Sequence, residues 1–150
     1  IINLQGDMPL IEPYHIKKVI EPLKHNFSIG TLSTKLNEEE KSNPNVTKVI
    51  VDWNKNNLGQ AIEFFRIKKN MQNNTYHHVG IYSYTQESLS QFISLPKSKN
   101  ENLLNLEQYR AMDAGMSIGV VYEEGIPLGV DTKEDLITVE SIIREKNEKN

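Results

Sequence analysis

Residues 1–11, IINLQGDMPLI, place a carboxylate directly behind an apolar run, because Gln5-Gly6-Asp7 separates two apolar segments. The first run predicts a buried strand over residues 1–4, and the glycine predicts a turn after it. Ligands of open α/β sheets bind beyond the carboxyl ends of the strands. We therefore expect an α/β fold in which Asp7 lies at a ligand-binding edge of the sheet.

A second carboxylate, Asp131, has the same setting, since it follows the apolar stretch IPLGV of residues 126–130. Two aspartates that converge at one edge suit Mg²⁺, which takes one or two carboxylates together with phosphate oxygens. The alternative is that Asp7 begins a turn and Asp131 caps the final helix. Spacing alone favours the capping role for Asp131, because aspartate is a preferred N-cap residue.

The first part of the chain predicts a helix followed by a hairpin. The expected elements are a helix over residues 12–23, a β-like run over 27–36, a polar loop over 37–45, and strands over 46–53 and 58–65. Proline suits the first turn of the helix at Pro13 and kinks or ends it at Pro22. Two apolar runs around the Asn-rich turn 54–57 favour an antiparallel hairpin.

The rest of the chain continues the alternation of strands and helices. The expected elements are a loop over 66–76, a strand over 77–84, a poorly defined helix near 85–95, a helix over 100–115, a strand over 116–124 and a final helix. Gly115 is placed to end the helix expected over residues 100–115. Thr132 and Asp135 form a Ser/Thr-x-x-Asp/Glu start, after which Leu136, Val139, Ile142 and Ile143 share one helical face. The order predicts one mixed α/β domain.

Composition excludes several classes of protein. Hydrophobic residues make up 37% and charged residues 25%, as in soluble globular domains. The net charge of -3 argues against a nucleic-acid binder, and no apolar run approaches the ~20 residues of a membrane span. The absence of cysteine excludes disulfides and thiolate metal sites. No export leader is present, so we expect a cytoplasmic protein.

Several polar residues lie in apolar surroundings. Arg66 ends the stretch AIEFFR, His78 lies at the start of a strand, and Glu107-Gln108 lies within the expected helix 100–115. Each has an ordinary explanation: a surface arginine, a structural histidine and a solvated pair. Together, however, they offer a cation, a switchable donor, a carboxylate and an amide, which suit a polyhydroxylated acid.

Six segments, in this order, resemble a known family: NLQGDMPLI, NPNVTKVIVD, AIEFFR, HHVGIYSY, NLEQYRAMDAGMSIGVV and IPLGVDTKEDL. Over nearly the whole chain the sequence is similar to the 3-deoxy-manno-octulosonate cytidylyltransferases, the CMP-Kdo synthetases. The resemblance implies a nucleotidyltransferase-like fold, a Rossmann-like three-layer α/β/α arrangement around a mixed sheet. It also implies a small antiparallel β subdomain, within about residues 46–85, that forms a homodimer interface.

The activity implied by the resemblance is transfer of a cytidylyl group from CTP to Kdo, giving CMP-Kdo and pyrophosphate for lipopolysaccharide synthesis, with Mg²⁺ as cofactor. No nucleic-acid or membrane partner is implied. The family's motifs fall on Gln5 and Gly6 for CTP and on Asp7 and Asp131 for Mg²⁺ and catalysis. Positions associated with the sugar acid fall on Arg66, His78, Tyr82, Glu107 and Gln108.

Two other functions stay open. One is a cytidylyltransferase for another sugar acid, such as a sialic acid or 8-amino-Kdo. The other is a non-catalytic, dimerising fragment, because the family's N-terminal phosphate-loop segment is not among these 150 residues. We expect the chain to be the C-terminal portion of a single cytidylyltransferase domain and to be inactive or very weak alone.

Overall fold

The structure, a computed structural model, describes residues 1–55, 57–127, 129–130 and 132–148. Its strands in chain order are β1 (Ile2–Asn3), β2 (Ile29–Thr34), β3 (Lys48–Lys55), β4 (Leu58–Phe65), β5 (Thr75–Tyr84) and β6 (Ile118–Tyr122). They form one sheet in the order β1-β5-β2-β6-β4-β3. The β2–β6 pair is parallel and the other pairs are antiparallel, so the sheet is mixed.

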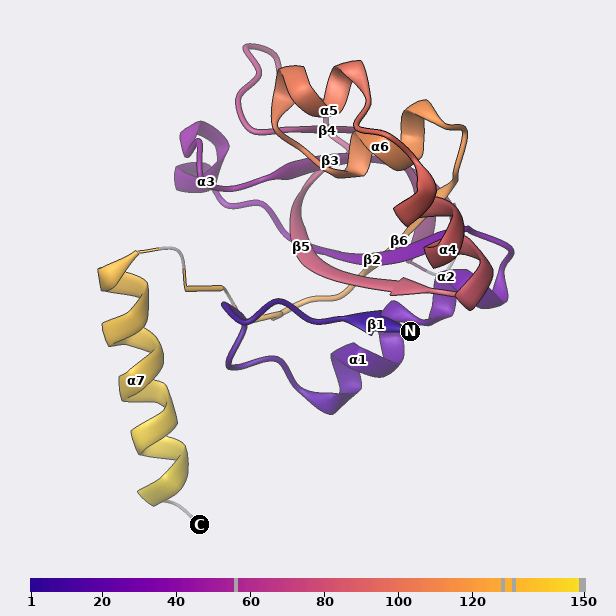
Figure 1. Ribbon diagram of the computed structural model, residues 1–150. Coiled ribbons are helices and arrows are strands. Elements are labelled where there is room, and N and C mark those ends of the chain that lie inside the picture. Colours follow the sequence, from indigo (N-terminus) through magenta and orange to yellow (C-terminus); the bar gives the residue numbers. More distant parts are fainter. Residues whose placement is uncertain (56, 128, 131, 149–150) are drawn as a thin grey trace.

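The β3–β4 hairpin, predicted from its Asn-rich turn, is confirmed. It is continuous with the rest of the sheet, because β4 pairs with β6 and β3 pairs with β5. The pairing therefore runs from β5 through β2, β6, β4 and β3 and returns to β5, which closes these five strands into a ring (Figure 1). Closure leaves β1 as an edge strand, which within the described part of the chain pairs with β5 alone.

Helices cover both faces of the sheet. In chain order the helices of the described residues are α1 (Pro13–Val19), α2 (Glu21–Lys24), α3 (Glu38–Ser42), α4 (Gln86–Ser94), α5 (Lys99–Leu104), α6 (Gln108–Asp113) and α7 (Lys133–Glu148), of which α7 does not lie on the sheet. Leu32 and Ile81 pack with Val19 of α1 on one face. Phe64 and Tyr84 pack with Ala111 of α6 on the other. Because side chains alternate along a strand, β2, β4, β5 and β6 each contribute residues to both cores. The mixed α/β prediction is confirmed.

The helix predicted over residues 12–23 is present but broken. Pro13 lies in the first turn of α1, as expected, and Pro22 lies in the first turn of α2. Ile20 ends α1 and begins α2. A proline cannot donate a backbone hydrogen bond to the preceding turn, so the chain changes direction there.

Two glycines allow this helical segment to lie directly on the sheet. Gly30 and Gly119 are partners across the parallel β2–β6 ladder. A Cβ atom on Gly119 would lie 2.5 Å from the Cβ atom of Pro22 and 2.6 Å from the ring of Phe27. A Cβ atom on Gly30 would collide with the carbonyl oxygen of Val19. The absence of side chains at this register pair is what permits the close approach of helix and strand.

Two loop and strand predictions were wrong. The expected buried strand over residues 1–4 is a two-residue edge strand, and Ile1 is 61% exposed. The expected polar loop 37–45 contains α3. Asn37 accepts a hydrogen bond from the Glu40 backbone, and Glu40 accepts one from the Asn37 backbone. This capping box stabilises the first turn, and its Asn-x-x-Glu pattern is visible in the sequence.

The prediction of one continuous helix over residues 100–115 was wrong, because the helix is interrupted in its middle. It is divided into α5 and α6 by Asn105, which has a φ of 53° in the left-handed region. Glu107 therefore caps the start of α6, and Gln108 is the first residue of that helix. Gly115, with a φ of 77°, follows α6 and confirms the predicted stop.

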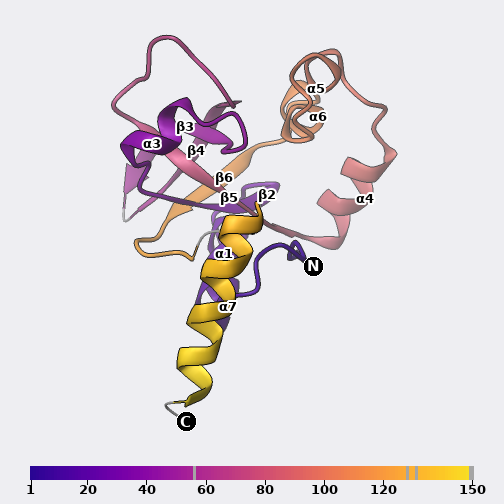
Figure 2. The ribbon, with the colours of Figure 1, turned by 90° about the vertical axis from the view of Figure 1, so that its left-hand side faces the viewer.

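The last helix, α7, extends away from the sheet (Figures 1 and 2). Its predicted start is confirmed by reciprocal hydrogen bonds between Thr132 and Asp135. Of its predicted apolar face, Val139 is buried whereas Leu136 is 47% exposed. Among the described residues, no helix is long and apolar enough to cross a membrane.

Candidate functional site

A pocket of about 410 Å³ opens where the turn after β1 meets the end of β4, the middle of β5 and the α5–α6 corner. Seven of the predicted site residues line it: Gln5, Asp7, Arg66, His78, Tyr82, Glu107 and Gln108. Gly6 lies between two lining residues but does not itself line the pocket. Asp131 lies outside the described residues. The structure thus brings together side chains that are up to 103 residues apart, from Gln5 to Gln108.

Asp7 is held at the pocket by its backbone. Met8, which is buried, donates its N–H to the carbonyl oxygen of Gln5 across the turn. The carbonyl oxygen of Asp7 accepts a 2.7 Å hydrogen bond from the N–H of Val130. The carboxylate of Asp7 has no hydrogen-bond or ion-pair partner among the described residues. An unpaired carboxylate on a pocket wall fits one ligand of a Mg²⁺ ion.

The backbone bond to Val130 also brings the chain just before Asp131 beside Asp7. At the start of α7, the hydroxyl of Thr132 accepts a hydrogen bond from the Asp135 backbone. Thr132 therefore caps the start of α7. No group of three or more His, Asp or Glu side chains suited to a metal occurs within the described ranges.

His78 is buried in the pocket wall, and its ring remains neutral. Burial, with a smaller contribution from His77, lowers the pKa of His78 to about 3. The prediction that His78 is a donor with a switchable charge was therefore wrong, because His78 does not change its charge near neutral pH. Its Nε2 lies 3.0 Å from the hydroxyl of Thr31, which also lies within hydrogen-bonding distance of the carbonyl oxygens of Val79 and Ile81.

The hydroxyl of Thr31 has one proton, and both carbonyl groups can only accept it. This arrangement favours the tautomer of His78 in which Nε2 carries the proton and donates to Thr31. Nδ1 of His78 is then an acceptor, suited to a hydroxyl group of a ligand.

Tyr82 and Gln108 form a second neutral pair. The Nε2 amide of Gln108 donates a 2.7 Å hydrogen bond to the hydroxyl of Tyr82. Burial, and then the charge of Glu107, raise the pKa of Tyr82 well above its ordinary value, so the phenol keeps its proton. The Oε1 atom of Gln108 is buried without a partner among the described residues. A buried acceptor without a partner is costly, and a ligand hydroxyl would satisfy it.

Arg66, which also lines the pocket, supplies a positive charge. Its NH1 nitrogen donates to the carbonyl oxygens of Pro44 and Asn45, at 3.1 and 3.0 Å. The hydrogen bonds described for this guanidinium involve NH1 alone, and the remaining N–H groups form a planar fork suited to a carboxylate.

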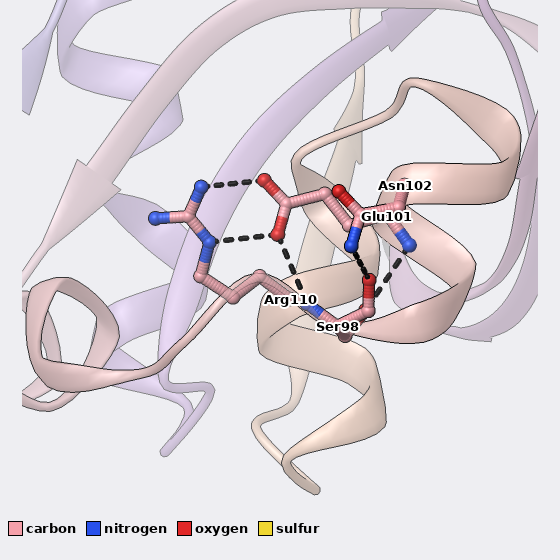
Figure 3. Close-up of polar contacts among 4 residues, drawn as sticks. All are labelled: Ser98, Glu101, Asn102 and Arg110. Carbon is pink, nitrogen blue, oxygen red and sulfur yellow. Dashed lines mark hydrogen bonds and ion pairs between the residues drawn. The ribbon is translucent and has the colours of Figure 1, made fainter.

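The α5–α6 corner carries Glu107 and Gln108 into the pocket. Arg110 forms a two-armed ion pair with Glu101, with Nε donating to Oε2 at 2.9 Å (Figure 3). Ser98 caps the start of α5 through the backbone N–H of Glu101 (Figure 3). The ion pair lowers the pKa of Glu101, through the hydrogen bond from Arg110. It joins α5 to α6 across Asn105 and fixes the direction of the corner.

Four further polar residues line the pocket and were not predicted from the sequence: Thr34, Asn45, Thr47 and His77. Thr34 and His77 are partners across the β2–β5 ladder. Their placement depends on strand register, which has no local signal in the sequence. For Asn45, the NPN stretch of residues 43–45 was the one available indication in the sequence, because such a stretch predicts a turn before a strand.

The pocket combines the Asp7 carboxylate, which no cation of the described residues pairs, with a guanidinium and two neutral hydrogen-bonding pairs. This set suits a ligand that has an acidic group and several hydroxyl groups, together with a metal-bound phosphate.

A family model described as "Cytidylyltransferase" matches residues 1–118. The chain is 40% identical to the 3-deoxy-manno-octulosonate cytidylyltransferase of Parvibaculum lavamentivorans over 139 residues, which are 91% of this chain and 54% of that relative. It is 43% identical to the protein of that name from Rhodopseudomonas palustris strain BisB5 over 141 residues, or 92% of this chain and 58% of the relative. The chain thus spans just over half the length of these curated relatives.

Among solved structures, the chain is similar to CMP:2-keto-3-deoxy-manno-octonic acid synthetase complexed with CTP. The TM-score is 0.82 and the sequence identity is 31%, over 97% of this chain and 61% of that chain.

Proposed function

Because the chain belongs to the cytidylyltransferase family, as its motifs predicted, we propose that the full-length protein transfers a cytidylyl group from CTP to Kdo. The relatives that match most of the chain have this activity in their names, and the similar solved structure was determined with CTP. The observation that carries the proposal is the single pocket that Asp7, Arg66, Tyr82 and Gln108 line together.

We place the sugar acid between Arg66 and the neutral pairs. The guanidinium of Arg66 would bind the carboxylate of Kdo through two parallel hydrogen bonds. The Oε1 atom of Gln108 and Nδ1 of His78 would accept hydrogen bonds from sugar hydroxyl groups. Because both acceptors are buried, a ligand that lacks these hydroxyl groups would leave them unpaired.

Asp7 and Asp131 would hold the Mg²⁺ ion, and Gln5 lies beside Asp7 at the same turn for contact with the nucleotide. Bound there, the ion would neutralise phosphate charge on CTP. The anomeric hydroxyl of Kdo would attack the α-phosphorus of CTP and lose its proton to solvent, and pyrophosphate would leave as the bond between the α-phosphorus and the bridging oxygen of the β-phosphate breaks. No covalent bond to the protein forms, so the chain's residues act by positioning and electrostatics.

The finer fold assignment follows from the same family. We propose a nucleotidyltransferase-like, Rossmann-like three-layer arrangement in which β3, β4 and the start of β5 serve as the small subdomain of a homodimer. The helices on both faces of the mixed sheet support the layered arrangement. We propose that the protein acts in the cytoplasm.

The test is pyrophosphate release by the full-length protein from CTP and Kdo, with and without Mg²⁺. Asp7→Asn should lower kcat/KM at least about 100-fold, because phosphate charge is no longer neutralised. Asp113→Asn is the matched control, since Asp113 is exposed on α6 outside the pocket, and it should stay within about twofold of wild type. Absence of Mg²⁺-dependent release, or full activity in Asp7→Asn, would contradict the proposal. Sialic acid and 8-amino-Kdo as competitors test the choice of sugar acid.

A further inference from the structure

Lys48 is a fully buried lysine, with 0% of its surface exposed. It lies at the start of β3, where it pairs with Phe65 of β4 on one side and His77 of β5 on the other. Its Nζ donates hydrogen bonds of 2.6 Å to the carbonyl oxygens of Asn43 and Arg66. A buried ammonium group is costly, so its partners identify what it does for the structure.

Those two partners belong to different segments. Asn43 precedes the turn that enters β3, and Arg66 follows the last residue of β4. Arg66 in turn donates from NH1 to the carbonyl oxygens of Pro44 and Asn45. Two cations therefore bind the three consecutive carbonyl groups of residues 43–45, and the first cation also binds the backbone of the second. The arrangement locks the backbone of Arg66 and its side chain to the same short loop.

Carboxylates do not neutralise these cations directly among the described residues. Glu40 acts on the charge of Lys48, but its oxygens bind the Nδ1 atom of His77 and the backbone N–H of Asn37. Burial and the charge of Arg66 lower the pKa of Lys48, whereas Glu40 opposes this effect. Backbone carbonyls fix the geometry of both cations without cancelling their charge. The edge of the pocket at Arg66 is thus both rigid and positive.

We propose that Lys48 is a positioning residue, which holds the guanidinium of Arg66 in place for the carboxylate of the sugar acid. This inference rests on the proposed function, since it assigns the ligand group that Arg66 meets. Lys48 itself does not line the pocket and contacts the ligand only through Arg66.

The experiment measures KM for Kdo and KM for CTP in the full-length enzyme with Lys48→Met, Arg66→Gln and the double variant. Lys48→Met should raise KM for Kdo about tenfold and leave KM for CTP within about twofold, because only the carboxylate loses its aligned partner. The double variant should be no worse than Arg66→Gln alone, since the two residues act as one unit. Lys69→Met is the matched control, because Lys69 is a nearby exposed lysine, and it should leave both KM values unchanged.

Lys48→Arg separates positioning from a simple need for buried charge. It keeps the charge, but its planar fork does not reproduce both carbonyl contacts, so KM for Kdo should rise again. It also carries the test if Lys48→Met does not fold. Three results would overturn the inference: additive effects in the double variant, equal changes in both KM values, or a wild-type KM for Kdo in Lys48→Arg. The proposed function would still stand in each case if the wild-type enzyme turns over CTP and Kdo. A wild-type enzyme that does not turn over CTP and Kdo would overturn both.

Discussion

The two walls of the pocket are held in different ways. The strand wall consists of His78 and Tyr82 on β5 together with Arg66 after β4, and the corner wall consists of Glu107 and Gln108 between α5 and α6. The strand wall is fixed by the β2–β5 and β4–β6 ladders, whose strands are distant in sequence. The corner wall rests on two six-residue helices, which are too short to be stable in isolation.

The corner wall therefore depends on the packing of Leu106 and Ala111 against the core and on a few specific polar contacts. The Glu101–Arg110 ion pair joins its two helices (Figure 3). The hydroxyl of Tyr109 donates a 2.9 Å hydrogen bond to the carbonyl oxygen of Phe64 on β4. One wall is thus part of the folding core, and the other is attached to it. The difference predicts that changes in the core disturb both walls, whereas changes at the corner disturb one.

The largest effect should come from Phe64→Ala, which removes a fully buried ring beneath both walls. We expect a loss of about 3–5 kcal/mol in the free energy of unfolding, from lost burial and the remaining cavity. Urea denaturation measures it. Ile62→Ala on the same strand is the control, because Ile62 is 51% exposed and its loss should cost less than about 1 kcal/mol. Similar losses in both variants would break the distinction between core and surface of β4.

The second largest effect on the free energy of unfolding should come from a fall in pH, which acts through His78 in the strand wall. The folded pKa of His78, about 3, lies below its ordinary value of 6.5. The unfolded chain takes up this proton as pH falls through 6.5 and the folded protein does not, so stability is fully present above pH 6.5 and is lost towards pH 3. The expected loss is about 1.4 kcal/mol per pH unit below pH 6.5, or about 2 kcal/mol between pH 7 and pH 5.

Denaturation at pH 7, 6 and 5 measures this dependence. His78→Gln should flatten the slope, whereas His25→Gln should not, because the His25 side chain is 56% exposed. A slope that is unchanged in His78→Gln would show that the strand wall is not the acid-sensitive part.

The smallest of the three effects should come from Glu101→Gln, which weakens the corner wall alone. The pair is only partly shielded, with Arg110 20% exposed, so we expect a loss of about 1–2 kcal/mol. Hydrogen exchange should become faster at the amides of α6 but not in the β2–β5 ladder. Glu38→Gln, which breaks an exposed pair with Lys41, should cost less than about 0.5 kcal/mol. Faster exchange in both regions would mean that the walls are not separate.

Local patterns in the sequence were sufficient to predict the strands other than β1, the hairpin, the proline break and the cap of α7. They failed where one residue outweighed the pattern, as at Asn105, or where exposure depended on distant pairing, as at β1. Most of the predicted site residues do line one pocket, and the family motifs rather than periodicity identified them. Lys48 was not predicted, because a lysine within an apolar strand gives no local sign that its ammonium group binds two carbonyls.

The paired glycines of β2 and β6 set a limit on how this sequence can change over time. A smaller residue in place of Phe27 would remove the nearest ring atoms at Gly119, although Pro22 would still crowd it. No side-chain change frees Gly30, because one of the atoms that blocks it is the backbone oxygen of Val19. Two positions that face each other in the ladder therefore differ in their evolutionary freedom. Gly119 can drift only after two neighbours shrink, and Gly30 can drift only if the chain between α1 and α2 takes another path.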